Sequence, residues 1–124
     1  MKSYITTPIY YVNGSPHIGH AFTSIMADIL KRNRQALGYE MMLSTGVDEH
    51  GQKNQEAAEE LGMPVTGYLD MRCKEFRDVF EQLGVEFDYF VRTSRDGHKT
   101  AVAEMEQRIF DKGLIVKKQY TGIY

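Results

Sequence analysis

Two histidines enclose a glycine in the stretch His17-Ile18-Gly19-His20, where the residue pattern changes from that of a strand to that of a helix. The segments 4–7 and 9–12 before it are rich in β-branched and aromatic residues, and 13–16 has the composition of a turn. After it, apolar residues recur every three to four positions until Gly38, which is placed to end a helix. The histidines are therefore expected at the N-terminus of a helix.

A helix N-terminus is a natural site for an anion, because its unpaired N–H groups and the helix dipole both attract negative charge. Gly19 has no side chain, so a triphosphate can approach the backbone closely there. The same dipole disfavours a charged imidazole at His17 or His20 in the empty site. This stretch therefore predicts a phosphate-binding site.

The composition limits the class of protein. At 124 residues the chain has room for one domain. Its formal net charge is -2 and its Lys and Arg residues are scattered, so the sequence predicts no basic patch that would bind nucleic acid by itself. The single cysteine, Cys73, excludes an internal disulfide, and the sequence shows neither a signal peptide nor an apolar run long enough to span a membrane. We therefore predict a cytoplasmic protein with no membrane partner.

Extended and helical segments alternate along the rest of the chain. The predicted strands span 40–45, 85–92 and 114–118, and the predicted helices span 52–61, 65–83 and 97–112, with Thr93 or Ser94 as the N-cap of the last helix. This alternation is typical of the α/β class, with an open parallel sheet and crossover helices. Because such nucleotide-binding sheets usually have more strands, we expect residues 1–124 to be the N-terminal part of a longer enzyme.

A polar loop at 46–51 is expected after the strand at 40–45, and loops at strand ends are where α/β proteins build their sites. Asp48 in this loop is suited to hold a substrate ammonium group near the two histidines. When ATP activates an amino acid, the carboxylate attacks the α-phosphate and pyrophosphate leaves, so the protein supplies alignment and charge stabilisation rather than a nucleophile. Two hydrogen-bonding imidazoles at a helix N-terminus suit that task.

Two stretches together carry a family resemblance. The first stretch is Thr6-Thr7-Pro8-Ile9-Tyr10-Tyr11-Val12-Asn13-Gly14-Ser15-Pro16-His17-Ile18-Gly19-His20, and the second is Thr45-Gly46-Val47-Asp48-Glu49-His50-Gly51. Both closely resemble the N-terminal sequence of methionyl-tRNA synthetases. The two histidines alone would indicate only the wider group of class I synthetases and nucleotidyltransferases. The residues that precede them, with the Asp-Glu-His-Gly loop further on, narrow the resemblance to the methionine enzymes, and it covers essentially the whole chain.

The resemblance implies that residues 1–124 form the N-terminal half of a Rossmann-like catalytic domain, in a ligase that joins methionine to tRNA(Met) through methionyl-adenylate. It implies methionine, ATP with Mg²⁺, and tRNA(Met) as substrates and partners. His17 and His20 are the implied catalytic residues, which stabilise the ATP phosphates in the transition state. The implied ATP-binding residues are Asn13, His17, Gly19 and His20, and the implied methionine-binding residues are Ile9, Tyr11 and Asp48.

The chain also lacks parts of the family pattern. The second signature of the family, a Lys-Met-Ser-Lys-Ser loop, does not occur, and Lys117-Lys118 does not replace it. The second half of the nucleotide fold, the connective insertion that binds zinc in many relatives, and the anticodon-binding domain would all follow Tyr124. We therefore expect this segment to bind no zinc and to be inactive alone.

Two other functions remain open from the sequence. One is a small nucleotidyltransferase with a His-x-Gly-His site, which would need a second basic loop and has no obvious use for Asp48. The other is a synthetase fragment that binds methionine, a nucleotide or a protein partner without turnover. Methionine-dependent exchange of pyrophosphate into ATP distinguishes these alternatives from the ligase.

Some residues near the expected site have a structural interpretation instead. A metal site built from His17, His20, Asp48 and His50 is conceivable in ligand type, but only their expected proximity supports it, so we predict none. Glu49 is expected to face solvent, and the sequence leaves open whether His50 does more than pack its loop. Tyr10 fits the core and the wall of the site equally well.

Overall fold

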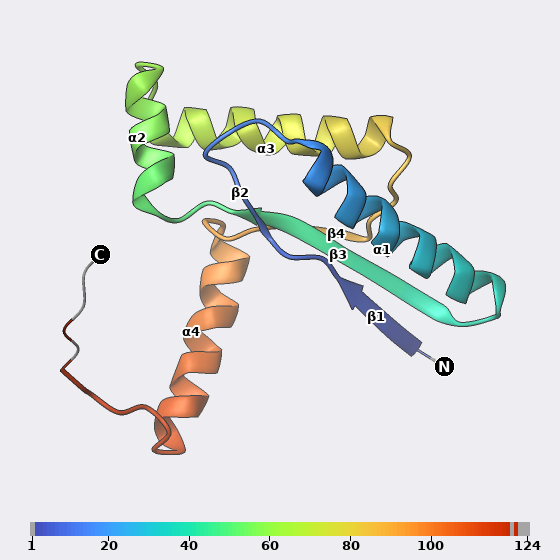
Figure 1. Ribbon diagram of the computed structural model, residues 1–124. Helices are drawn as coiled ribbons and strands as arrows, with labels where there is room; N and C mark the ends of the chain where they lie inside the picture. Colours follow the sequence, from blue (N-terminus) through green and yellow to red (C-terminus); the bar gives the residue numbers. More distant parts are fainter. Residues whose placement is uncertain (1, 120, 122–124) are drawn as a thin grey trace. The chain divides into compact units, whose positions relative to one another are not determined.

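The computed structural model describes residues 2–119 and 121 (Figure 1). The chain divides into two compact units, Met1–Ser94 and Arg95–Tyr124. The first unit holds β1 (Lys2–Thr6), β2 (Tyr10–Tyr11), α1 (Ile18–Ala36), β3 (Glu40–Asp48), α2 (Gln52–Glu60), α3 (Val65–Gln82) and β4 (Tyr89–Arg92), and the second holds α4 (Asp96–Asp111). No helix in the described part of the chain is both long enough and apolar enough to cross a membrane.

β3 is the central strand of a parallel sheet. Its Ser44 pairs with Thr6 of β1 and with Tyr89 of β4, and its Val47 pairs with β2 and β4 in the same way. A strand residue can pair with only one other strand on each of its two sides. β4 therefore lies along one side of β3, and β1 and β2 lie along the other. The predicted α/β class with a parallel sheet and crossover helices is confirmed.

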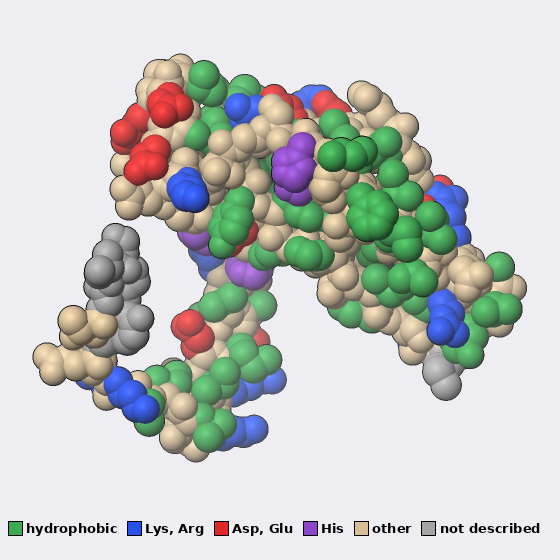
Figure 2. Space-filling view, in the orientation of Figure 1, with side chains coloured by type: hydrophobic (Ala, Val, Ile, Leu, Met, Phe, Trp, Pro, Cys, Tyr) green, Lys and Arg blue, Asp and Glu red, His purple; other side chains and the backbone are tan. Residues whose placement is uncertain are grey.

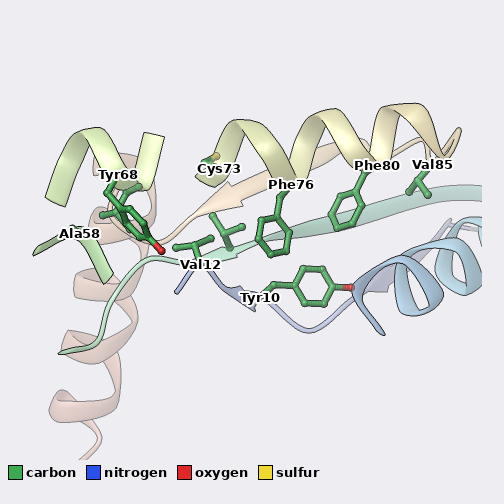
Figure 3. Close-up of a cluster of buried hydrophobic side chains, with 10 residues drawn as sticks. Tyr10, Val12, Ala58, Tyr68, Cys73, Phe76, Phe80 and Val85 are labelled. Carbon is green, nitrogen blue, oxygen red and sulfur yellow. The ribbon is translucent and has the colours of Figure 1, made fainter. Parts of the chain in front are cut away.

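Three buried rings of α3 form the core of the first unit (Figure 3). Tyr68, Phe76 and Phe80 are fully buried and pack in one cluster with Val12 and with Tyr10 from β2. The ring of Tyr10 lies 5.9 Å from the rings of both phenylalanines. This cluster fixes the segment between β2 and α1, where the predicted site residues lie.

The apolar line that indicates α1 in the sequence is not its buried face. Phe22 is 66% exposed and Ile29 is 51% exposed, and Figure 2 shows apolar side chains gathered over α1. The face turned inward carries small residues and two charged residues, Asp28 and Lys31, which do not pair with each other: Asp28 pairs with Arg32, and Lys31 with Asp88. Lys31 donates from Nζ to the Glu86 carbonyl at 3.0 Å, and Asp28 accepts the Glu86 backbone N–H at 3.1 Å. Polar contacts with the chain before β4 therefore hold this face of α1, rather than its apolar line, toward the interior.

The predicted loop at 46–51 begins later than expected. Gly46, Val47 and Asp48 belong to β3, because neighbouring strands pair with them: Val47 and Asp48 with β2, and Gly46 and Val47 with β4. A Cβ at Gly46 would lie 2.2 Å from the Val91 carbonyl oxygen, so this close approach requires glycine. Pairing with strands distant in sequence therefore overrides the local turn signal.

Three other predictions about the last segments differ from the structure, one of them only in its bounds. The strand predicted at 85–92 is present but confined to β4, and residues 114–118 form no strand. Val116 is 69% exposed, and the segment has no sheet partner among the described residues, which explains why it does not form one. The N-cap of α4 is Arg95 rather than Thr93 or Ser94. These two residues bind the end of β3 instead.

Candidate functional site

Two imidazoles cap the start of α1. The Nδ1 of His17, the N-cap residue, accepts the Gly19 backbone N–H at 3.1 Å, and the Nδ1 of His20 accepts the His17 backbone N–H at 3.1 Å. The two rings stack with their centroids 3.8 Å apart. Since Nδ1 accepts in both, each neutral ring carries its proton on Nε2. The site therefore has two Nε2–H donors, one from each ring.

The charge state of His20 follows from its surroundings. Burial lowers its pKa from the ordinary value of 6.5, and the neighbouring His17 lowers it further. Its ring packs on Tyr10, with centroids 4.8 Å apart, and on Phe76, with centroids 5.0 Å apart. Burial, contact with these rings and the neighbouring His17 therefore all favour the neutral form of His20.

A hollow of about 340 Å³ opens at this helix start. It collects five of the seven predicted site residues, and its complete lining is Ile9, Tyr10, Tyr11, Asn13, Gly14, Ser15, His17 and His20. Tyr10 thus serves both the core and the site wall, because it is buried and also borders this hollow. The structure thus brings three of the predicted ATP-binding residues and two of the predicted methionine-binding residues to one hollow.

The other two predicted residues lie beside the hollow rather than in its wall. Gly19 is in the first turn of α1, where a Cβ would lie 3.0 Å from Cε1 of His17 and crowd that ring. Asp48 is the last residue of β3 and pairs in register with Tyr11, which lines the hollow. Paired residues of neighbouring strands project from the same face of a sheet. Asp48 and Tyr11 therefore share one face.

A second hollow, of about 490 Å³, shares Tyr11 and Asn13 with the first. Its remaining wall comes from the start of α2 and the two residues before it, namely His50, Gly51, Gln52, Lys53, Asn54 and Glu56. Within the described residues, no group of three or more His, Cys, Asp or Glu side chains could hold a metal ion.

Glu49 is buried, and its expected exposure is wrong. Its side chain has no solvent exposure, and its Oε1 accepts two hydrogen bonds from Arg92, from Nε at 2.8 Å and from Nη2 at 2.5 Å. Its Oε2 accepts from Ser94, from Oγ at 2.7 Å and from the backbone N–H at 3.2 Å. Arg92 also pairs through Nη1 with Asp70 of α3 at 2.7 Å. No local sequence signal indicates this network, because its members come from three separate segments of the chain.

The pKa of Glu49 predicts how stability depends on pH. Burial alone would raise that pKa, but the hydrogen bonds from Arg92 and Ser94 outweigh burial and hold it below the ordinary value of 4.5. A lowered carboxyl pKa stabilises the folded state above the unfolded-state value, and this stability is lost as the pH falls through the folded-state value. Urea unfolding of wild type and Glu49→Gln should show the wild-type advantage shrinking below pH 4.5. An advantage that is the same at all pH values would contradict this assignment.

Comparisons with known proteins agree with the geometry. A family profile described as "tRNA synthetases class I (M)" matches residues 3–124. The chain is 46% identical to the methionine–tRNA ligase of Mycoplasma pneumoniae, over 99% of this chain and 24% of that protein. It is 42% identical to the methionine–tRNA ligase of Thermotoga maritima, over 100% of this chain and 20% of that protein.

Solved structures show the same likeness. The Mycobacterium tuberculosis methionyl-tRNA synthetase in complex with methionyl-adenylate superposes with a TM-score of 0.87 at 35% identity, covering 90% of this chain and 22% of that one. The chain therefore spans about a quarter of the length of the curated relatives it matches.

Proposed function

The chain belongs to the class I tRNA synthetases of the methionine type, and from this membership we propose that its protein joins methionine to tRNA(Met) through methionyl-adenylate. The observation that carries the proposal is the pair of capping imidazoles beside a hollow that also contains Tyr11 and Asn13. We further propose that residues 1–124 supply the first half of the catalytic domain, and that the protein works in the cytoplasm.

The start of α1 suits the phosphates of ATP. In the first step, an oxygen of the methionine carboxylate bonds to the α-phosphorus, and the bond from that phosphorus to pyrophosphate breaks. Negative charge on the phosphate oxygens is then stabilised by donors that are already fixed in place. His17 and His20 would provide such donors through Nε2–H, because their Nδ1 atoms are engaged by the backbone.

The same face of the sheet suits methionine. Tyr11 and Ile9 offer aromatic and apolar surface, which fits a thioether that hydrogen-bonds poorly. Asp48, beside Tyr11, would receive the α-amino group. Mg²⁺ would arrive bound to the ATP phosphates, since no carboxylate cluster among the described residues fits it, and we propose that this segment holds no zinc.

Methionine-dependent exchange of pyrophosphate into ATP, measured on the full-length protein, tests the proposal. Exchange with methionine supports a ligase. A nucleotidyltransferase gives none with methionine, and a binding module gives methionine affinity without exchange. The comparisons do not favour these two alternatives, because the matched relatives are methionine–tRNA ligases.

Replacing Asp48 with alanine should weaken methionine binding about 10- to 100-fold, because the ammonium group would lose its charged partner. The KM for methionine in the exchange assay measures this effect, whereas the KM for ATP should change little. Glu40→Ala is the matched control, since Glu40 is an exposed carboxylate at the opposite end of β3. Equal methionine KM values for the two variants would remove Asp48 from the methionine site.

A further inference from the structure

We propose that Thr93 is a positioning residue, which holds the Asp48 carboxylate in the orientation that receives the substrate ammonium group. The proposal rests on the proposed function of Asp48 and adds a residue to it. Thr93 follows the last residue of β4 and is 5% exposed. Its hydroxyl is therefore buried, next to the end of β3.

Thr93 contacts four consecutive residues at the end of β3. Its backbone N–H donates to the Val47 carbonyl at 3.4 Å, and its carbonyl lies 3.2 Å from Nε2 of His50. Its Oγ1 accepts the Glu49 backbone N–H at 2.8 Å. The same hydroxyl donates to Oδ1 of Asp48 at 3.4 Å. One side chain thus connects the backbone after β3 to the carboxylate that the site requires.

The direction of the hydroxyl proton follows from these contacts. A threonine hydroxyl has one proton and two acceptor lone pairs. The Glu49 N–H occupies a lone pair, so the proton remains available for Asp48, whose Oδ1 is its acceptor. The other carboxylate oxygen, Oδ2, has no hydrogen bond to any residue in the described part of the chain.

The two oxygens of Asp48 are therefore different. Oδ1 accepts the Thr93 hydroxyl at 3.4 Å and the His50 backbone N–H at 3.2 Å. Two donors on one oxygen set the rotation of the carboxylate about its Cβ–Cγ bond. Oδ2 is left as the oxygen for the ammonium group of methionine. A hydrogen bond to a charged group contributes more than one between neutral groups, so this orientation should matter for binding.

The neighbours of Thr93 keep its hydroxyl in place. Arg92 and Ser94, on either side of it, both bind the carboxylate of the buried Glu49. Arg92 is further tied to Asp70 of α3. The segment around Thr93 is therefore anchored on both sides, and a change confined to its hydroxyl should alter Asp48 without freeing the strand.

The test replaces only the hydroxyl. Thr93→Val has nearly the same shape but can neither donate to Asp48 nor accept the Glu49 N–H, whereas Thr93→Ser keeps the hydroxyl for both. In pyrophosphate exchange by the full-length protein, Thr93→Val should raise the methionine KM about tenfold, with kcat and the ATP KM within about twofold of wild type. Thr93→Ser should stay close to wild type. If Thr93→Val does not fold, Thr93→Ala gives the same comparison.

Two controls separate positioning from general stability. Thr45→Val removes another buried threonine hydroxyl from β3, one that bonds Thr7 at 2.8 Å and not Asp48, so it should lower stability without raising the methionine KM. In an Asp48→Ala background, Thr93→Val should have no further effect on that KM, because the hydroxyl acts through Asp48.

A ligand without the amino group gives an independent readout. Inhibition by 4-(methylthio)butanoate, which is methionine lacking its amino group, should be equal in wild type and Thr93→Val. A wild-type methionine KM in Thr93→Val, or equal weakening of both ligands, would overturn the proposal. Absence of exchange in wild type would instead refute the proposed function, so the two failures are distinguishable.

Discussion

Replacing His20 with alanine should slow methionyl-adenylate formation about 10²- to 10³-fold, and His17→Ala should slow it at least about 10²-fold. Each change removes one Nε2–H donor that the capping arrangement leaves available. The methionine KM should stay nearly unchanged, because the lost interaction develops in the transition state. Single-turnover formation of the adenylate measures the effect directly.

The control for this prediction is His98→Ala. His98 lies in α4 and is not part of the hollow at the start of α1. His20→Gln should retain more activity than His20→Ala, since glutamine can place an amide N–H near the position of Nε2. Wild-type rates in both alanine variants would exclude the two histidines from the chemical step.

Phe76→Ala should lower the free energy of unfolding by about 3–5 kcal/mol, the usual cost of truncating a fully buried phenylalanine. Its ring is completely buried, and its centroid lies 5.9 Å from that of Tyr10 and 6.1 Å from that of Phe80. Loss of the ring leaves a cavity behind the segment that carries the site. Urea unfolding, followed by circular dichroism, measures the change.

Phe22→Ala is the matched control for this prediction. Phe22 is also a helical phenylalanine, but it is 66% exposed, so its truncation should change stability by no more than about 0.5 kcal/mol. The comparison tests the finding that α1 buries the face opposite its apolar line. Equal destabilisation by the two substitutions would contradict that finding.

Local sequence signals predicted most of the elements of the first unit. The helix expected at 65–83 is α3, which periodic apolar residues indicate, and the one expected at 52–61 is α2, a polar segment closed by Gly62. Both signals act within a single segment. The start of α1 was predicted for the same reason, and with it the position of His17 and His20. Signals of this kind need no knowledge of neighbouring strands.

The features that local sequence signals do not predict depend on contacts between distant segments of the chain. The extension of β3 to Asp48 comes from its pairing with β2 and β4. Glu49 looked like a loop residue, yet it is buried because Arg92 and Ser94 supply the donors that its charge needs. Thr93 resembled a helix cap by residue type, and only the fold shows that its hydroxyl is directed to Asp48.

The central claim is that the hollow beside the two capping imidazoles is the site where methionine is activated. Exchange of labelled pyrophosphate into ATP, measured on full-length wild type and on the double variant His17→Ala/His20→Ala, tests this most directly. The account predicts exchange that requires methionine and is not supported by leucine, with a loss of more than about 10²-fold in the double variant. Exchange at the wild-type rate in the double variant, or no methionine-dependent exchange in wild type, would contradict it.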